Sequence, residues 1–172
     1  MDSGGITVNA EEQKKRSIIL GNYGTDYYYR TLVAYYGLGA LPPQEAIYID
    51  LKSDAAKQQL NGNYNYIIHF DKGRLPPAKA FWSLTVYDKE RYLSKNDINR
   101  YAIGDRDSLK YNADGSLDIH IGHQKPGAAK VSNWLPAPAD QFYLIFRIYV
   151  PKENYVKNRS VWKNPQLQKI TE

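Results

Sequence analysis

The chain has 172 residues, of which 42% are hydrophobic and 24% charged, and these values exclude an intrinsically disordered protein. It contains no cysteine, which excludes disulfides, thiol nucleophiles and thiolate metal sites. The formal net charge is +5, but most lysines and arginines neighbour acids, as in DKER at 88–91, so a solvated surface is favoured over nucleic-acid binding.

The sequence predicts a short N-terminal segment, the lead, followed by one folded domain. Residues 1–9 are expected to be a disordered lead, and residues 10–172 a single domain with helices at about 10–36 and strands from about 46. No apolar run approaches the roughly 20 residues that a bilayer crossing needs, and no apolar segment of a secretory signal is present. We therefore expect neither a membrane span nor a signal peptide, and the localisation stays open.

Two helices are expected before the strands begin. The first covers Ala10–Leu20 and has acids in its first turn, where they suit the helix dipole. The second begins at Thr25–Asp26 and carries Tyr28, Leu32 and Tyr35 on one face. A helix of this amphipathic kind is expected to pack on an edge or end of a sheet.

From residue 46 onward the pattern becomes that of β-strands. The expected strands are AIYIDL (46–51), NGNYNYIIHF (61–70), AFWSLTVYD (80–88), INRYAIGD (98–105), LKYN (109–112), SLDIHI (116–121) and FYLIFRIYVP (142–151). LKYN and SLDIHI are expected to form a hairpin, with Gly115 at positive φ in its turn. The third strand is the predicted centre of a sheet, and the last is expected to be central or buried on both faces. This spacing predicts a mainly β fold, a sandwich or jelly roll.

Several long segments carry a resemblance to a known family. They are YGTDYYYRTLVAYYGLGALPPQEAIY, LPPAKAFWSLTVYD, INRYAIGDRDSLKYNADGSLDI, NWLPAPADQFYLIFRIYVPK and VWKNP, spread from Tyr23 to the C-terminus. Together they resemble the DUF1214 domain, which is defined by sequence and has no established activity. The resemblance implies a jelly-roll-like antiparallel β-sandwich with one or two N-terminal α-helices. Such domains often follow a related β-domain, DUF1254, in bacterial proteins, and similar sequences occur in large algal viruses.

Tyrosine is the unusual residue of this chain. There are sixteen tyrosines against four phenylalanines. Because tyrosine combines a large apolar ring with a hydroxyl that needs water or a partner, such a chain keeps many aromatics half-buried at edges, clefts or contact surfaces. The tyrosine content therefore favours a binding function.

Catalytic constellations are weakly supported by the sequence. His120 and His123 are three residues apart, which places them on opposite faces of a strand rather than around a zinc ion. Ser83 lies in a core-like strand without a G-x-S-x-G elbow. Aspartates at 105, 107, 114 and 118 could pair for glycoside chemistry, but turn aspartates that bond their own backbone explain them equally. We predict no catalytic residue, no metal site and no cofactor.

One group of polar and aromatic residues is the candidate binding site. Its members are Trp82, Asn99, Arg100, Tyr101, Asp105, Arg106, His120 and Trp134. Arginines beside aromatic rings can hold a carboxylate, a phosphate or a sugar. Alternatively, Asn99–Tyr101 fixes the strand that follows, Arg106 pairs with Asp105 or Asp107, and Trp134 fills a gap between prolines.

The leading hypothesis is a non-catalytic binding or assembly module with a tyrosine-rich surface that contacts a protein partner, another copy of the chain, or a glycan. A second hypothesis is an enzyme acting on a small polar or sugar-like substrate in the mouth of the sandwich, which requires Arg100, Arg106 and His120 to converge. A third is a structural protein of a virion or surface. A polyanion-binding face, the weakest alternative, is expected in the segment 150–163.

Overall fold

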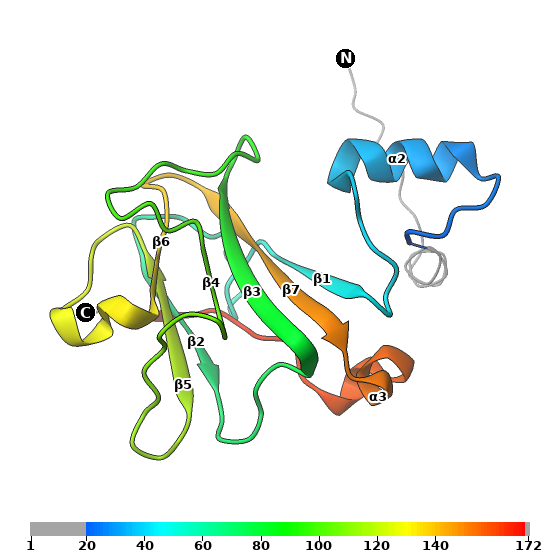
Figure 1. Ribbon diagram of the computed structural model, residues 1–172. Coiled ribbons are helices and arrows are strands. Elements are labelled where there is room, and N and C mark those ends of the chain that lie inside the picture. Colours follow the sequence, from blue (N-terminus) through cyan, green and yellow to red (C-terminus); the bar gives the residue numbers. More distant parts are fainter. Residues whose placement is uncertain (1–19, 171–172) are drawn as a thin grey trace.

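The computed structural model describes residues 20–170, and they form two four-stranded β-sheets that face each other (Figure 1). The mainly β sandwich expected from the sequence is confirmed, while jelly-roll connectivity stays a prediction. The disordered lead and nearly all of the first expected helix, Ala10–Leu20, fall outside the described residues.

The elements follow one another in a helix–strand order close to the predicted one. The helices are α2 (Tyr27–Gly37), α3 (Glu153–Lys157) and the 3-10 turns η1 (Ala128–Asn133) and η2 (Arg159–Val161). The strands are β1 (Ala46–Leu51), β2 (Asn65–Phe70), β3 (Ala78–Asp88), β4 (Ala102–Gly104), β5 (Leu117–Gly122), β6 (Trp134–Pro136), β7 (Phe142–Pro151) and β8 (Gln168–Ile170).

The first sheet has the order β1-β7-β3-β4 and is antiparallel throughout. Its two long strands, β3 and β7, lie in the middle, as predicted for both. The second sheet has the order β6-β5-β2-β8. Here β6 runs parallel to β5, which departs from the expected purely antiparallel sandwich, because a long crossover through η1 returns the chain before β6 begins.

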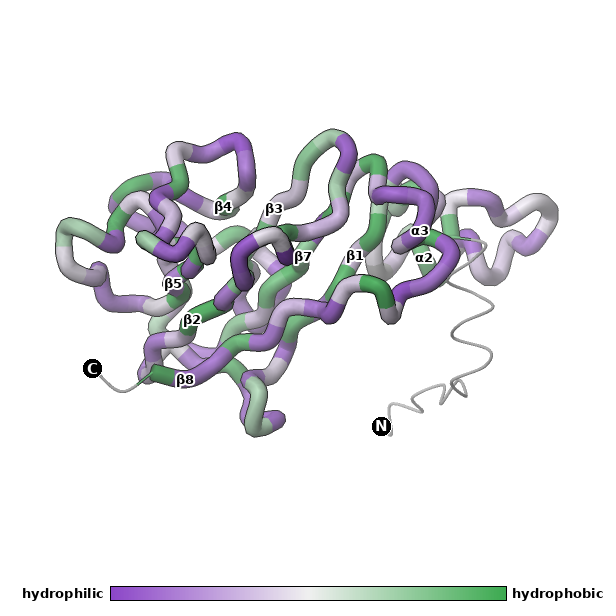
Figure 2. The backbone as a smooth tube through the Cα atoms, turned by 90° about the horizontal axis from the view of Figure 1, so that it is seen from below, coloured by the Kyte–Doolittle hydropathy of each residue, from purple (hydrophilic) through white to green (hydrophobic). Residues whose placement is uncertain are grey.

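The core lies between the sheets, and the alternation that builds it is clearest along β7. On β7 the residues Phe142, Leu144, Phe146 and Ile148 are buried, while those between them are half-buried. The ring of Phe146 stacks on Trp82 of β3, with ring centroids 5.4 Å apart. Apolar segments are accordingly concentrated on the strands and polar ones on the loops (Figure 2).

Helix α2 forms where it was expected but does not cover a sheet. Asp26 caps it, and its Oδ1 accepts a hydrogen bond from the Tyr29 N–H at 2.9 Å. The helix stands beside the sandwich, beyond β1 (Figure 1), and Tyr28 and Tyr35 are 61% and 78% exposed. The expected packing is therefore wrong for α2, because the connection of residues 38–45 carries the helix beyond β1 and leaves these rings in solvent. None of the helices between residues 20 and 170 has the length and apolar character for a membrane crossing.

The predicted hairpin around Gly115 is correct only at its turn. Gly115 has a φ of +85°, and its N–H donates to the Asn112 carbonyl at 2.9 Å. The arm at 109–112 is not a strand: β6 pairs only with His120–Gly122 of β5, and at the edge before them the Asp118 carbonyl bonds to the side chain of Asn133 instead of to this arm.

A side-chain amide holds this arm in place of a strand ladder. Buried Asn133 accepts a hydrogen bond from the Lys110 N–H at 2.8 Å and donates to the Lys110 carbonyl at 2.7 Å. Its amide also donates to the Asp118 carbonyl at 2.9 Å. One side chain thereby satisfies backbone groups of two segments.

Candidate functional site

The eight residues singled out by the sequence do not form one cluster. The two tryptophans, Trp82 and Trp134, are buried at 3% and 6% exposure. The Trp134 indole N–H donates to the Gly122 carbonyl at 3.0 Å. Both indoles are therefore parts of the folded body rather than open stacking platforms.

Arg100 is used to fasten the crossover before β6. Its guanidinium Nη1 donates to the carbonyls of Val131 and Trp134, both at 2.8 Å. Its neighbour Asn99 takes positive φ, and the hydroxyl of Tyr101 donates to the Asn99 side chain at 3.3 Å. This arrangement matches the structural alternative for the segment 99–101.

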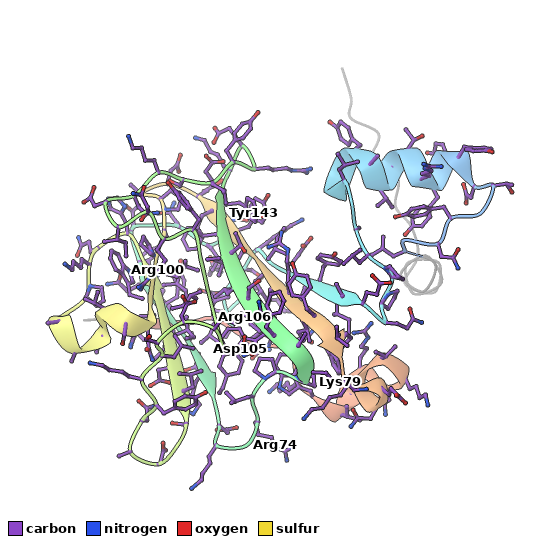
Figure 3. All side chains as sticks on the ribbon, in the orientation of Figure 1. Arg74, Lys79, Arg100, Asp105, Arg106 and Tyr143 are labelled. Carbon is purple, nitrogen blue, oxygen red and sulfur yellow. The ribbon has the colours of Figure 1, made fainter. Side chains whose placement is uncertain are left out.

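Asp105 and Arg106 lie beside β3, apart from Arg100 (Figure 3). The Asp105 carboxylate accepts a hydrogen bond from the Trp82 N–H at 3.1 Å. The Arg106 guanidinium carbon lies 4.0 Å from the centroid of the Phe81 ring, in a cation–π contact rather than in the expected ion pair with an aspartate.

Two of the candidates, His120 and Trp134, lie next to each other, and a small cavity lies beside them. They are paired in register across β5 and β6 and line a cavity of 40 Å³. A space of this size admits water but not a sugar or a cofactor. The cavity therefore carries no chemistry of its own.

The outer face of the first sheet holds a group of which the sequence singled out only Arg106. We call it the aromatic–arginine face, and it consists of Phe81, Tyr87, Arg106, Tyr143, Arg147 and Tyr149. Phe81 stacks on Tyr149 with ring centroids 4.3 Å apart, and Tyr87 stacks on Tyr143 at 5.4 Å. These four rings are half-buried, and desolvation raises the pKa of the Tyr143 hydroxyl.

Arg147 lies between the two stacked pairs on this face. Its guanidinium donates to the Thr85 hydroxyl at 2.9 Å and to the Tyr87 hydroxyl at 2.8 Å. The signal in the sequence that could have revealed this face is the period of two along each strand. It places Phe81 and Tyr87 on one face of β3, and Arg147 and Tyr149 on one face of β7. The sequences of the two strands do not indicate which ring of β3 stacks on which ring of β7.

The outer face of the second sheet carries a histidine–carboxylate pair. His69 on β2 and Asp118 on β5 are direct partners in register, with His69 Nδ1 2.6 Å from an Asp118 carboxylate oxygen. The other carboxylate oxygen accepts a hydrogen bond from the Asn112 amide at 2.9 Å. The hydrogen bond with Asp118 raises the pKa of His69, and Asp71, 3.4 Å from Nε2, adds to this effect.

His69 borders a cleft on this side of the sandwich, with a volume of 460 Å³. It lies between the end of β2 and the segment from Ser160 to Gln168, and Arg74 and Lys163 also line it. Across residues 20–170, no three histidine, aspartate or glutamate side chains converge as metal ligands would.

Two aromatic-lined β-sheets that enclose one core define this protein as a β-sandwich domain. The chain belongs to the DUF1214 family, described as protein of unknown function, whose model matches residues 45–153. The predicted family membership is thus confirmed. No curated protein is similar to the chain at a significant level.

Two solved structures share the fold. The VPA0106 protein from Vibrio parahaemolyticus is 32% identical with a TM-score of 0.68, over 80% of this chain and 34% of that one. An uncharacterized protein from Burkholderia cenocepacia is 17% identical with a TM-score of 0.54, over 78% of this chain and 31% of that one. The chain therefore spans about a third of the length of each, and neither protein is described with an activity.

Proposed function

We propose that this chain is a non-catalytic contact module that binds a protein surface through the aromatic–arginine face. The observation that supports it is the pair of ring stacks, Phe81–Tyr149 and Tyr87–Tyr143, held half-buried with arginines beside them. Tyrosine, phenylalanine and arginine are the residues enriched at protein interfaces. Rings already stacked on each other lose little side-chain entropy when a partner covers them.

A protein partner fits this face better than a small substrate does. The residues that an enzyme would have needed together are separated, because Arg100 binds the carbonyls of Val131 and Trp134 while Arg106 lies on Phe81. In the two solved relatives, the region matching this chain is joined to about twice its length of further polypeptide. The partner to which the proposal commits is a second copy of the chain, since two copies present the same face and can cover each other's rings.

The test is sedimentation velocity over a range of protein concentrations. We expect the average mass of the wild type to rise with concentration. Replacing Phe81 and Tyr149 by serine removes one stacked pair and should weaken association at least about tenfold, as loss of a buried aromatic anchor does.

The matched control removes two exposed tyrosines elsewhere. Replacing Tyr28 and Tyr35 of α2 by serine should leave the association unchanged, because neither belongs to the proposed face. Cooperative thermal unfolding must be retained by both double variants. A wild type that stays monomeric at every concentration, or a loss of association in the α2 variant alone, would contradict the proposal.

A further inference from the structure

The cleft beside His69 results from the way the second sheet ends. Strand β8 pairs with Asn65–Ile67 of β2, and the cleft opens directly beyond, at His69 and Asp71. Its far wall is the segment from Ser160 to Gln168 that leads into β8. At 460 Å³ it lies in the size range of sites for small organic molecules.

One wall of the cleft is fixed by a tryptophan. The Trp162 indole N–H donates to the Arg74 carbonyl at 2.9 Å. The Arg74 N–H in turn donates to the Asp71 carbonyl at 2.9 Å and closes the turn after β2. The backbone that carries the Arg74 guanidinium is thus anchored to the opposite wall.

The charges around the cleft favour an anion. Arg74 and Lys163 line it as permanent cations, against the single carboxylate of Asp71. His69 adds a further positive charge when it is protonated. An oxyanion can accept charge-assisted hydrogen bonds from these groups, and the guanidinium of Arg74 offers the planar geometry that a carboxylate fits.

The remaining polar wall suits hydroxyl groups. Besides the charged residues, the cleft is lined by the side chains of Ser160, Asn164, Gln166 and Gln168. Amide side chains both donate and accept hydrogen bonds, which is how proteins recognise hydroxyl groups of polar ligands. Four apolar residues, Phe70, Val161, Trp162 and Pro165, complete the lining.

We propose that this cleft binds a small hydroxylated organic anion, with Arg74 and Lys163 contacting its carboxylate and the amide side chains contacting its hydroxyls. This site is separate from the aromatic–arginine face, which lies on the other sheet, so either proposal can fail without the other.

Binding at this site depends on pH through His69. Four charged groups lie around it: Asp118 on β5, Asp71 and Arg74 in the turn after β2, and Lys163 on the far wall. A fifth is Asp114, whose pKa the positive charge of the imidazole helps to lower. Below the raised pKa of His69 the imidazolium adds attraction for an anion, and above it that attraction is lost. Affinity is therefore higher at about pH 6 than at about pH 8.

Calorimetric titration of the full chain with sodium glucuronate tests the proposal, since this probe carries one carboxylate and several hydroxyls. We expect saturable binding at about pH 6 that weakens several-fold at about pH 8. Lys163→Ala and Arg74→Ala should each weaken it by about tenfold. Asp71→Asn should strengthen it because the competing carboxylate is removed, and His69→Gln should abolish most of the pH dependence.

Three comparisons make the outcome decisive. Lys52→Ala, an exposed lysine of the first sheet region, is the matched control and should bind as the wild type does. Neutral glucose should bind more weakly than glucuronate, and inorganic phosphate should as well. Absence of saturable glucuronate binding, equal binding by Lys163→Ala, or phosphate binding as tight as glucuronate overturns the proposal.

Discussion

The two sheets of this sandwich present the same kind of surface inward and different surfaces outward. Inward, both supply fully buried apolar side chains, such as Leu84 and Phe146 from the first sheet and Ile68 and Ile119 from the second. Outward, the first sheet carries stacked rings and arginines. The second carries histidine, aspartate and amide groups around an open cleft.

The difference lies in where the polar groups find their partners. On the first sheet Arg147 donates to Thr85 and Tyr87, which belong to the neighbouring strand of the same sheet. On the second sheet Asp118 pairs with His69 of the neighbouring strand, but it also has partners from outside the sheet, because Asn112 donates to its carboxylate and Asn133 of η1 donates to its carbonyl. The polar groups of the first sheet are thus closed within the sheet, whereas the second sheet depends on segments outside it and also borders the cleft walled by Ser160 to Gln168.

The largest expected effect on stability is beside the second sheet, where Asn133→Ala removes a buried amide that makes three hydrogen bonds to the backbone. The free energy of unfolding should fall by about 2–3 kcal/mol, because Lys110 and Asp118 lose hydrogen bonds in a buried setting. Urea denaturation measures this, and Gln124→Ala, which removes an exposed amide, should change stability by less than about 0.5 kcal/mol. Equal effects of the two substitutions would mean that the loop is held by other contacts.

The regular part of this architecture was predictable because its signals are local. The residues of β1 and β7 are those expected, β1 from the alternation in AIYIDL and β7 from the long, nearly continuous apolar run FYLIFRIYVP. The positive φ of Gly115 was likewise predictable from its turn. Strand β6 was not expected, because three residues placed by a distant crossover leave no period to detect.

The candidate site was less predictable because contacts across strands depend on register. Arg100 and Arg106 are close in sequence but have unrelated partners, Val131 and Phe81. His69 and Asp118 are 49 residues apart and became partners only when β2 paired with β5. Register is set by the whole inner face of a sheet, so no single segment contains it.

A smaller effect on stability is expected from substitutions of Arg147 on the first sheet. Both Arg147→Met and Arg147→Lys should lower the free energy of unfolding by about 1–1.5 kcal/mol, because methionine has no donor and the single nitrogen of lysine does not reproduce the two nitrogens with which Arg147 donates to the Thr85 and Tyr87 hydroxyls. Chemical denaturation at two salt concentrations measures the change. If the lysine variant is as stable as the wild type, the positive charge matters and the forked geometry does not, and the contrast between the sheets weakens.

The smallest effect is expected at the exposed pair of the second sheet, where Asp118→Asn removes the charge that faces His69. The pKa of His69 should fall toward its ordinary value of about 6.5, as an NMR titration of the imidazole would show. Because the folded pKa is raised, the pair stabilises the wild type fully below about pH 6.5 and loses this contribution as the pH rises through the folded pKa.

As the pH rises from about 6.5 through the folded pKa of His69, the free energy of unfolding of the wild type should therefore fall by less than about 1 kcal/mol, since the pair is solvated. The free energy of unfolding of Asp118→Asn should hardly change over the same range. Asp71→Asn is the control, because its carboxylate is 3.4 Å from Nε2 and contributes less to the raised pKa of His69. A His69 pKa unchanged by Asp118→Asn but lowered by Asp71→Asn would place the dominant interaction inside the cleft rather than across the strands.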